Sequence, residues 1–484
     1  MSIRSAASRE YYESYGLDYE LTLSSPLATE SLVLNLMVIE LNQYEDMYGP
    51  FMRMEVVIND SMGLLDKFPL VGDETLTFKY GNPNEKKFTA EYVVYKVSGR
   101  QGVKDRNHVY TLHAISKIGH KNSLEYIYKP FIEKTPHEIV QDVYKNYLKG
   151  DKELVIWPGI NKITRVGSGQ NPLQFINQIA KESQAPPTGG GAGYDSTSSY
   201  LFFESIDYVI YMPLYILFQP NTLPRDPYYE FYLSVPKEEE QMVEGKGAFP
   251  ARSISNIKFL DSFDNLDQAH RGAYYNEVNV IDPILKRFKV HPLKEPDKKK
   301  FQFDYKKNWD QINHIDNSGK KFVSEQGELG KAKKAYSTHR RMIVSQIEED
   351  NETYPVDSSA YFKAMQPFKA GDQLNAPRKR DLFLSKTVHE RANMSTNVIE
   401  ITTPGIAEIY IGNLVKIKIP QPTQLDGETS KFLFLYGQEA TFIVTAIRHN
   451  YNTAQDTYTT VLSCSKESFG IEPKGKAFDN SPES

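Results

Sequence analysis

Two short segments that begin in almost the same way place the strongest constraint on how this chain can fold. One runs from Thr135 to Leu148 and the other from Asn171 to Ala180. Each opens with a residue able to cap a helix, then has proline at the first helical position and Glu or Gln at the third. Each continues as an apolar stripe at helical spacing. The motif residues are Thr135, Pro136 and Glu138 at the start of the first segment, and Asn171 and Pro172 at the start of the second, with Phe175 in its apolar stripe.

The second predicted helix leads into a Gly/Ser-rich loop and then an aromatic strand, Tyr200–Glu204. Helix, loop and strand in this order predict a small α/β unit. Strand-rich sequence lies on both sides of it, so the unit is expected between two β regions.

Length and composition narrow the class of protein. A chain of 484 residues is too long for one ordinary core and fits about three or four domains. Aromatic residues make up 12%, with 32 Tyr and 25 Phe, which favours strands and large contact surfaces. A net charge of −5 does not indicate a polycation for nucleic acid, and Cys464 as the only cysteine excludes an internal disulfide and a cysteine-rich metal site.

The sequence predicts no membrane insertion. Its most apolar run, from 208 to 218, is too short to span a bilayer and is interrupted by Pro213. The first residues have no apolar core of the kind found in secretory signals. The chain is therefore expected to be made in the cytoplasm of its host.

Alternation of apolar and polar residues predicts strands in two regions. Residues 17–118 contain several short strands separated by Gly, Pro and Asn turns, which is typical of an antiparallel barrel or sandwich. Strand character returns after 205 and again in the last 90 residues, with a lysine-rich stretch of little periodicity between 286 and 380. The predicted fold class is mainly β with a small α/β part: two similar antiparallel β-barrels, a helix-containing domain and an insertion.

The predicted divisions are residues 1–118 for the first barrel, 119–204 for the α/β domain, 205–281 for the first part of the second barrel, 282–394 for an insertion with a helix near 379–393, 395–472 for the rest of the second barrel, and 473–484 for a disordered tail.

The sequence contains no strong motif for catalysis, cofactor binding or metal binding. The glycines of 189–193 lack the spacing and following helix of a phosphate loop, and Gly167–Gly169 lacks the spacing of a nucleophile turn. His108 and His113 would point to opposite faces of one strand, so they are not expected to share a metal. We predict no catalytic, cofactor-binding or metal-binding residues, although the sequence leaves open a carboxylate pair facing across a cleft.

The order of motifs resembles the central hub proteins of contractile phage tail baseplates, which are related to the base of type VI secretion spike proteins. The resemblance covers about 400 residues and departs from the family between 286 and 380. Its motifs are the Tyr48–Asp60 strand entry with Gly49 and Pro50, the turn at Gly72–Glu74, the two capped helices, the Arg271–Glu277 segment with Gly272 and Tyr274, the turns at Gly405 and Gly412, and the strand that ends at His449.

The resemblance implies a structural protein rather than an enzyme, without a cofactor. Such hubs are homotrimers whose six barrels form a ring between the six-fold tail tube and the three-fold central spike. The other implied partners are baseplate wedge proteins, with DNA and tape-measure protein as passing cargo, and the implied location is the tail baseplate of a virion. A polar or acidic channel wall is expected, with the lysines of 298–307 facing outward. Two other functions stay open: a tail-associated cell-wall or capsule hydrolase, and a carbohydrate-binding tail module.

Overall fold

A computed structural model describes most of the chain. The described residues are 17–68, 70–81, 87–102, 107–159, 162–185, 199–219, 222–223, 229–233, 253–261, 264–282, 287–289, 302–304, 314–315, 339–344, 380–395, 397–419 and 440–467. Most of the predicted insertion, including lysines 298–300, 306 and 307, and all of the predicted tail lie outside these ranges.

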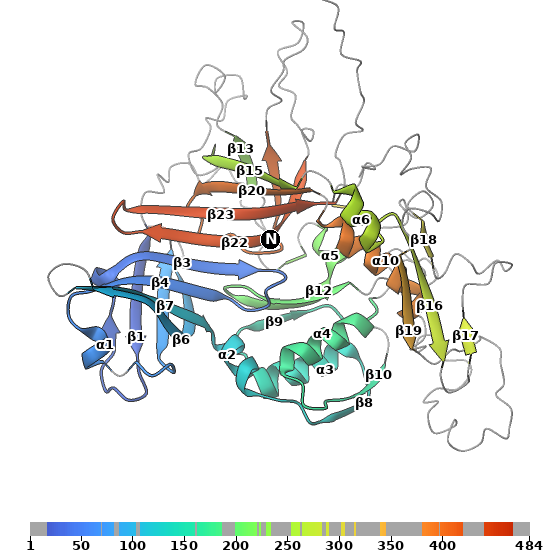
Figure 1. Cartoon of the computed structure of the whole chain (residues 1–484), viewed down its shortest axis with the longest axis horizontal. Helices are drawn as coiled ribbons and strands as arrows, with labels where there is room; N and C mark the ends of the chain where they lie inside the picture. The colour runs from blue at the N-terminus through green and yellow to red at the C-terminus, as the bar shows by residue number, and fades with distance from the viewer. Residues whose placement is uncertain are drawn as a thin grey trace, which may run out of the picture.

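The fold is mainly β with a small helical part, as predicted, and one sheet of fourteen strands dominates it (Figure 1). Seven of its strands come from the first predicted barrel and form what we call the first lobe. They pair antiparallel in the order β3-β4-β7-β6-β5-β1-β2. Two short helices, η2 (Asn35–Met37) and α1 (Leu64–Lys67), lie in their connections. The strands are β1 (Asp18–Ser24), β2 (Leu32–Val33), β3 (Val38–Asp46), β4 (Arg53–Asp60), β5 (Thr75–Gly81), β6 (Phe88–Gly102) and β7 (His108–Ser116).

The other seven strands form the second lobe. Two of its pairings are parallel, those of β13 with β14 and with β21, whereas the sequence predicts antiparallel strands throughout. Parallel neighbours need long connections, and local alternation carries no signal for them. The strands are β13 (Tyr229–Leu233), β14 (Ser253–Ile254), β15 (Asn256–Asp261), β20 (Asn397–Pro404), β21 (Leu414–Lys418), β22 (Thr441–Asn452) and β23 (Thr457–Lys466).

The long strand β22 joins the two lobes. Residues 441–443 of β22 pair with β21, and residues 446–452 pair antiparallel with β3 of the first lobe. Strand β23 covers the opposite edge of β22 over most of its length. We call the β3–β22 pairing the seam; it makes the sheet continuous from one lobe to the other (Figure 1).

The α/β unit lies below the second lobe in Figure 1. The two capped helices occur where the sequence predicts them, as α3 and α4. Strand β12 pairs with β11 and, in parallel, with β9, so residues 208–213, which the sequence assigns to the second barrel, lie in the sheet of this unit. The elements are α2 (Lys117–Leu124), β8 (Pro130–Lys134), α3 (Pro136–Val143), η4 (Tyr144–Leu148), β9 (Glu153–Ile156), β10 (Ile163–Val166), α4 (Pro172–Glu182), β11 (Tyr200–Glu204), β12 (Tyr208–Pro213) and α5 (Leu214–Leu217).

A further small sheet stands apart on the right of Figure 1. Strand β16, which the sequence places in the second barrel, pairs instead with β17, β18 and β19. Helices α6 and α10 pack beside it. The elements are α6 (Asn265–Arg271), β16 (Tyr275–Asp282), β17 (Arg287–Lys289), β18 (Gln302–Asp304), β19 (His339–Val344) and α10 (Arg380–Asn393).

Two apolar cores hold these parts together. The first lobe curls around one core, because inward side chains of β1, β4 and β7 such as Leu21, Val56 and Leu112 belong to a single buried cluster. The other core runs without a break from the α/β helices to the second lobe, including Phe175 and Phe442. The α/β unit and the second lobe therefore share a core, whereas the first lobe has its own.

Gly405 provides a test of packing in the second lobe. Its amide donates to the Tyr458 carbonyl at 2.9 Å, and a Cβ at this position would overlap the Tyr458 ring. We expect Gly405→Ala to lower the free energy of unfolding by about 1–3 kcal/mol, because overpacking a filled site forces neighbours to move. Urea denaturation would measure this.

The matched control is Gly102→Ala. A Cβ there would meet only His108 Cε1, at 4.0 Å. A change within about 0.5 kcal/mol is expected for such a site. Equal effects of the two substitutions would contradict the packing at Gly405.

Candidate functional site

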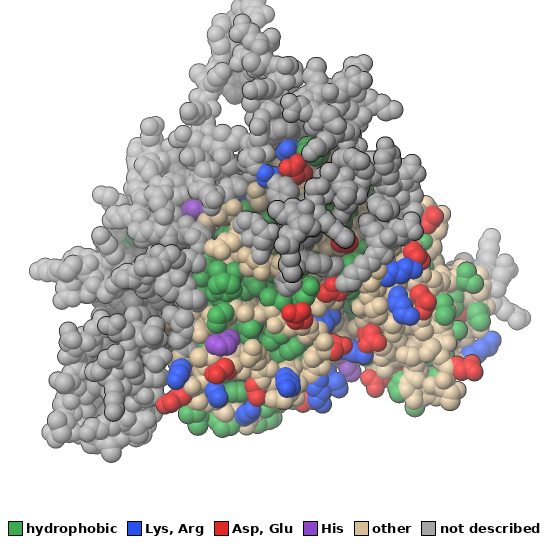
Figure 2. Space-filling view, turned by 180° about the vertical axis from the view of Figure 1, so that it is seen from behind, with side chains coloured by type: hydrophobic (Ala, Val, Ile, Leu, Met, Phe, Trp, Pro, Cys, Tyr) green, Lys and Arg blue, Asp and Glu red, His purple; other side chains and the backbone are tan. Residues whose placement is uncertain are grey.

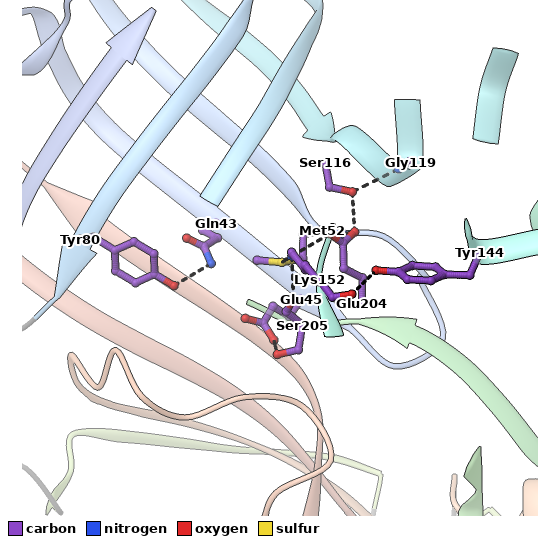
Figure 3. Close-up of polar contacts among 10 residues, drawn as sticks. All are labelled: Gln43, Glu45, Met52, Tyr80, Ser116, Gly119, Tyr144, Lys152, Glu204 and Ser205. Carbon is purple, nitrogen blue, oxygen red and sulfur yellow. Dashed lines mark hydrogen bonds and ion pairs between the residues drawn. The ribbon is translucent and has the colours of Figure 1, made fainter. Parts of the chain in front are cut away.

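A group of buried polar side chains lies where the first lobe meets the α/β unit (Figure 3). We call it the junction cluster. It draws on strands and loops from four separate parts of the sequence, and its two carboxylates and two serines are each exposed by 3% or less. Its members are Glu45 on β3, Ser116 at the end of β7, Lys152 before β9, and Glu204 and Ser205 at the end of β11.

Glu204 is the centre of the junction cluster. Its carboxylate accepts hydrogen bonds from Lys152 Nζ at 2.7 Å, from the Met52 amide at 3.3 Å and from the Ser116 hydroxyl. The Glu204 amide donates to the Pro50 carbonyl at 3.0 Å. Glu204 thus ties the end of β11 to three points of the first lobe and its margins.

Lys152 and Ser205 extend the cluster to the seam. Lys152 Nζ also donates to the Ser205 carbonyl at 2.7 Å, and Ser205 Oγ donates to Glu45 Oε2 at 2.7 Å. Tyr144 Oη, at the end of the first capped helix, donates to the Lys152 carbonyl at 2.7 Å. The cluster therefore connects the capped helix, the α/β sheet and strand β3.

The junction cluster contains two carboxyl groups, those of Glu45 and Glu204, but only one ammonium group, that of Lys152. Burial raises the pKa of Glu45 to about 7, and the charge of Glu204 adds to the rise. The hydrogen bond from Ser205 and the charge of Lys152 oppose it, as does the Ile411 amide, although that amide lies outside ordinary hydrogen-bond geometry. Glu45 therefore holds its proton close to neutral pH.

The chemistry of the cluster favours packing over catalysis. A carboxylate with a raised pKa can act as a general acid, but only when it reaches a substrate. Glu45 and Glu204 are each 1% exposed and bonded to neighbouring protein groups, so no substrate reaches them in this structure.

A second set of buried polar atoms lies on β3, β6 and β22, and it shares Glu45 with the junction cluster. Four of them, on Gln43, Glu45, Tyr92 and His449, have no hydrogen-bond partner in the protein. Each unsatisfied buried group costs about 1–3 kcal/mol. Four together would cost about 4–12 kcal/mol, as much as the whole stability of an ordinary domain.

The predicted helix-start residues form the expected caps. The Thr135 amide donates to Glu138 Oε2 at 2.9 Å, and this hydrogen bond is the main cause that lowers the pKa of Glu138. Asn171 Oδ1 accepts from the Gln174 amide at 3.1 Å. Phe175 is buried with its ring centroid 5.4 Å from that of Phe131. Pro136 and Pro172 occupy the first turns.

The remaining predicted residues fall in three separate places. Gly49 and Pro50 form the turn beside Glu204. Gly272 ends α6 with a positive φ of 86°, and Tyr274 Oη donates to Gln268 Oε1 at 2.6 Å.

Gly405, Gly412 and His449 lie in the second lobe, on or beside β20–β23. The ring of Tyr458 lies against Gly405, and its hydroxyl is 3.0 Å from His449 Nδ1, so the structure brings these two predicted residues together. Gly412, with φ of 88°, donates its amide to the Val444 carbonyl at 2.8 Å. All three are structural positions; their part in a ring stays a prediction.

The sequence did not reveal the junction cluster. Its members lie near 45, 116, 152 and 204, and no spacing rule connects such distant positions. One local signal existed: Gln43 and Glu45 occupy the same face of a strand as the buried Leu41, where an apolar residue is the norm.

Within the described ranges, no group of three or more His, Cys, Asp or Glu side chains is placed to hold a metal. Of the helices that the structure describes, none is long and apolar enough to cross a membrane.

The outer face of the β8–β10 ribbon is apolar. Its inner face packs on α4 through Phe131, while Tyr128, Ile132 and Val166 are 75%, 65% and 60% exposed. Val166 lies opposite Pro130, which places both on the outer face with Tyr128 and Ile132. Figure 2 shows that hydrophobic side chains also reach the rear surface in patches between acidic and basic ones.

Lys152 tests the importance of the junction cluster. We expect Lys152→Met to lower the free energy of unfolding by about 3–5 kcal/mol, because it leaves the Glu204 carboxylate buried without its ammonium partner. Adding Glu204→Gln to this variant should restore part of the loss, since the unpaired charge is then gone. Chemical denaturation of the three proteins measures both effects.

The control is Lys79→Met, which breaks the exposed pair with Glu20. Its expected cost is below about 1 kcal/mol. If Lys152→Met cost no more than this control, the junction cluster would not hold the units together.

The raised pKa of Glu45 should make the stability of the fold depend on pH. Its folded pKa of about 7 lies above the value of 4.5 expected for the unfolded chain, so its stabilising effect is complete below pH 4.5 and is lost as pH rises through 7. Relative to Glu45→Gln, which cannot ionise, the wild type should lose about 3 kcal/mol between these limits.

Unfolding free energies of both proteins from pH 4.5 to 8 would measure that difference. The buried His389 and His449, whose pKa values burial lowers to about 4, change stability in the opposite direction, but they are present in both proteins and cancel. A difference that stays constant over this range would rule out the proton on Glu45.

Comparison with known proteins identifies the fold. No protein-family model and no curated protein matches the sequence. Solved structures do match. The tail protein from Neisseria meningitidis MC58 is 8% identical, with 93% of this chain and 96% of that chain covered and a TM-score of 0.50. The 43 kDa tail protein of prophage MuSo2 from Shewanella oneidensis is 9% identical, with 93% and 98% covered and a TM-score of 0.48.

Prophage tail protein gp18 from Listeria monocytogenes EGD-e is 8% identical, with 93% and 95% covered and a TM-score of 0.44. At such low identity the likeness concerns the fold alone. The Neisseria structure confirms the predicted resemblance at the level of the fold: this chain has the fold of that tail protein.

Proposed function

We propose that this chain is the central hub of a contractile phage tail baseplate, or of a related injection machine, and that it acts as a homotrimeric ring. The observation that carries the proposal is the seam, which joins two seven-stranded lobes of one chain into a continuous sheet. Three copies would supply six lobes around one axis. Such a ring has three-fold symmetry by chain and nearly six-fold symmetry by lobe, as a joint between a six-fold tube and a three-fold spike requires.

The outer face of the seam supports a channel wall. It carries Glu40, Asn42 and Tyr44 on β3 and Arg448 and Asn450 on β22, which we call the seam face. Arg448 Nε donates to Asn42 Oδ1 at 2.8 Å, and Asn450 Nδ2 donates to Glu40 Oε1 at 2.7 Å. Its polar groups are thus largely satisfied by one another.

A surface of this kind suits the passage of cargo. DNA binds where free cations neutralise its phosphates. On the seam face, Nη2 of Arg448 lies 3.5 Å from Oε1 of Glu40, so the charge of this arginine is already paired. Exposed apolar side chains would hold an extended protein, but none of the large hydrophobic side chains found exposed in the described residues lies on β3 or β22. We propose that the seam face lines the channel for DNA and tape-measure protein.

The rest of the proposed role follows from the ring. The chain would be a structural protein rather than an enzyme, with the tail tube, the central spike and baseplate wedge proteins as partners. Its place would be the tail baseplate of the virion, after synthesis in the host cytoplasm.

The native mass of the full chain, over a concentration series and with and without its spike, tests the ring. We expect a trimer, or a monomer that becomes a trimer on concentration or on addition of the spike. A monomer under every condition would contradict the hub and favour the hydrolase or the carbohydrate-binding module.

In the trimer, single cysteines then test the channel wall. Cys464 is fully buried, so an added surface cysteine is the accessible thiol. With tube and spike closing both ends, Arg448→Cys should react with a small maleimide but not with a bulky polyethylene-glycol maleimide. The control Lys145→Cys, on an exposed helix position, should react with both. If the protein is a trimer but Arg448→Cys reacts with the bulky reagent, the ring proposal stands and the seam face does not line the channel.

A further inference from the structure

The interior of the first lobe contains polar atoms that the protein itself does not satisfy. They belong to four side chains, each exposed by no more than 4%, which we call the seam quartet. The atoms are Gln43 Oε1, Glu45 Oε1, Tyr92 Oη and His449 Nε2.

Two of the quartet face each other across the seam. Gln43 on β3 lies directly opposite His449 on β22, which puts both side chains on the inner face of the sheet. Tyr80 lies beside both: its hydroxyl accepts from Gln43 Nε2 at 3.0 Å, and its ring centroid is 6.3 Å from that of His449.

The other two are their neighbours. Glu45 follows Gln43 by two residues and so occupies the same face of β3. Tyr92 on β6 lies directly opposite Ser116, a member of the junction cluster, and it interacts electrostatically with both Glu45 and Tyr80. Figure 3 shows Gln43, Tyr80 and Glu45 in this part of the interior, with Glu45 continuing towards Ser205 and the junction cluster.

Donors and acceptors within the quartet are complementary but do not bond to each other. The Nδ1 atom of His449 faces the hydroxyls of Tyr458 and Thr460, at 3.0 and 3.3 Å. When Nδ1 accepts from them, Nε2 carries a proton and must donate, whereas Gln43 Oε1 can only accept. Glu45 Oε1 and Tyr92 Oη are complementary in the same way, because a phenol can donate to a carboxyl oxygen.

Water is the ligand that fits these couples. It can donate twice and accept twice, and buried water in proteins typically makes two to four hydrogen bonds to polar groups left over from folding. An ion does not fit, since the quartet offers donors and acceptors side by side. We propose that the interior of the first lobe is a binding site for ordered water, in which water molecules bridge the members of the seam quartet.

A crystal structure of the full chain, at a resolution that defines ordered water, tests the site. We expect density at about 2.7–3.2 Å from at least two quartet atoms at once. Absence of such density, in a map that defines buried water elsewhere, would overturn the proposal. Direct hydrogen bonds within the quartet, reached by turning the Gln43 amide, would also overturn it.

A variant assigns the density to the quartet. In Gln43→Leu the water bound at Gln43 and His449 should disappear, while water at Glu45 and Tyr92 stays. Thr111→Val, at a half-exposed position on β7, is the control and should leave all the internal water in place. If Gln43→Leu does not fold, His449→Leu removes the other partner of the same bridge. Density that is unchanged in the quartet variant would count against the proposed bridge.

Discussion

The pairing of β3 with β22 is the contact on which the rest of this structure depends. It joins residues about 400 positions apart, and each strand would otherwise present an open edge of N–H and C=O groups, which invites pairing with other chains. The entropy lost on closing a loop grows only slowly with loop length, so this pairing of distant strands carries only a small extra entropic cost once both lobes have formed. Because β22 continues into its pairing with β21, the same strand fixes one lobe relative to the other.

The seam also separates two kinds of polar chemistry. On its outer face, Arg448 and Asn450 bond with Glu40 and Asn42, so these charges are matched at the surface. Its inner face carries Gln43 and Glu45 into an otherwise apolar core. Strand β3 therefore connects two polar regions. One is the junction cluster, where two carboxyl groups share one ammonium group, and the other is the part of the interior where buried polar atoms have no hydrogen-bond partner in the protein.

The junction cluster explains how a third unit can be held at a fixed place. The α/β unit shares its apolar core with the second lobe, but its contact with the first lobe at this point is polar and directional. An apolar contact tolerates sliding, whereas Glu204 bonded to Lys152, Met52 and Ser116 does not. For a chain proposed to form one third of a ring, the relative placement of its units is the property that matters most.

The sequence by itself determined the local structure. Thr135 and Asn171 predicted where two helices begin, because caps and first-turn prolines act within a single helical turn. The alternation of apolar and polar residues predicted strands in both lobes. It did not determine which sheet each strand joins. Strands β12 and β16 have the pattern of lobe strands but pair elsewhere, because an apolar strand fits any sheet that offers an edge. The seam, the junction cluster and the seam quartet were decided only by tertiary structure, since hydrogen bonds between residues hundreds of positions apart leave no periodic trace in a sequence.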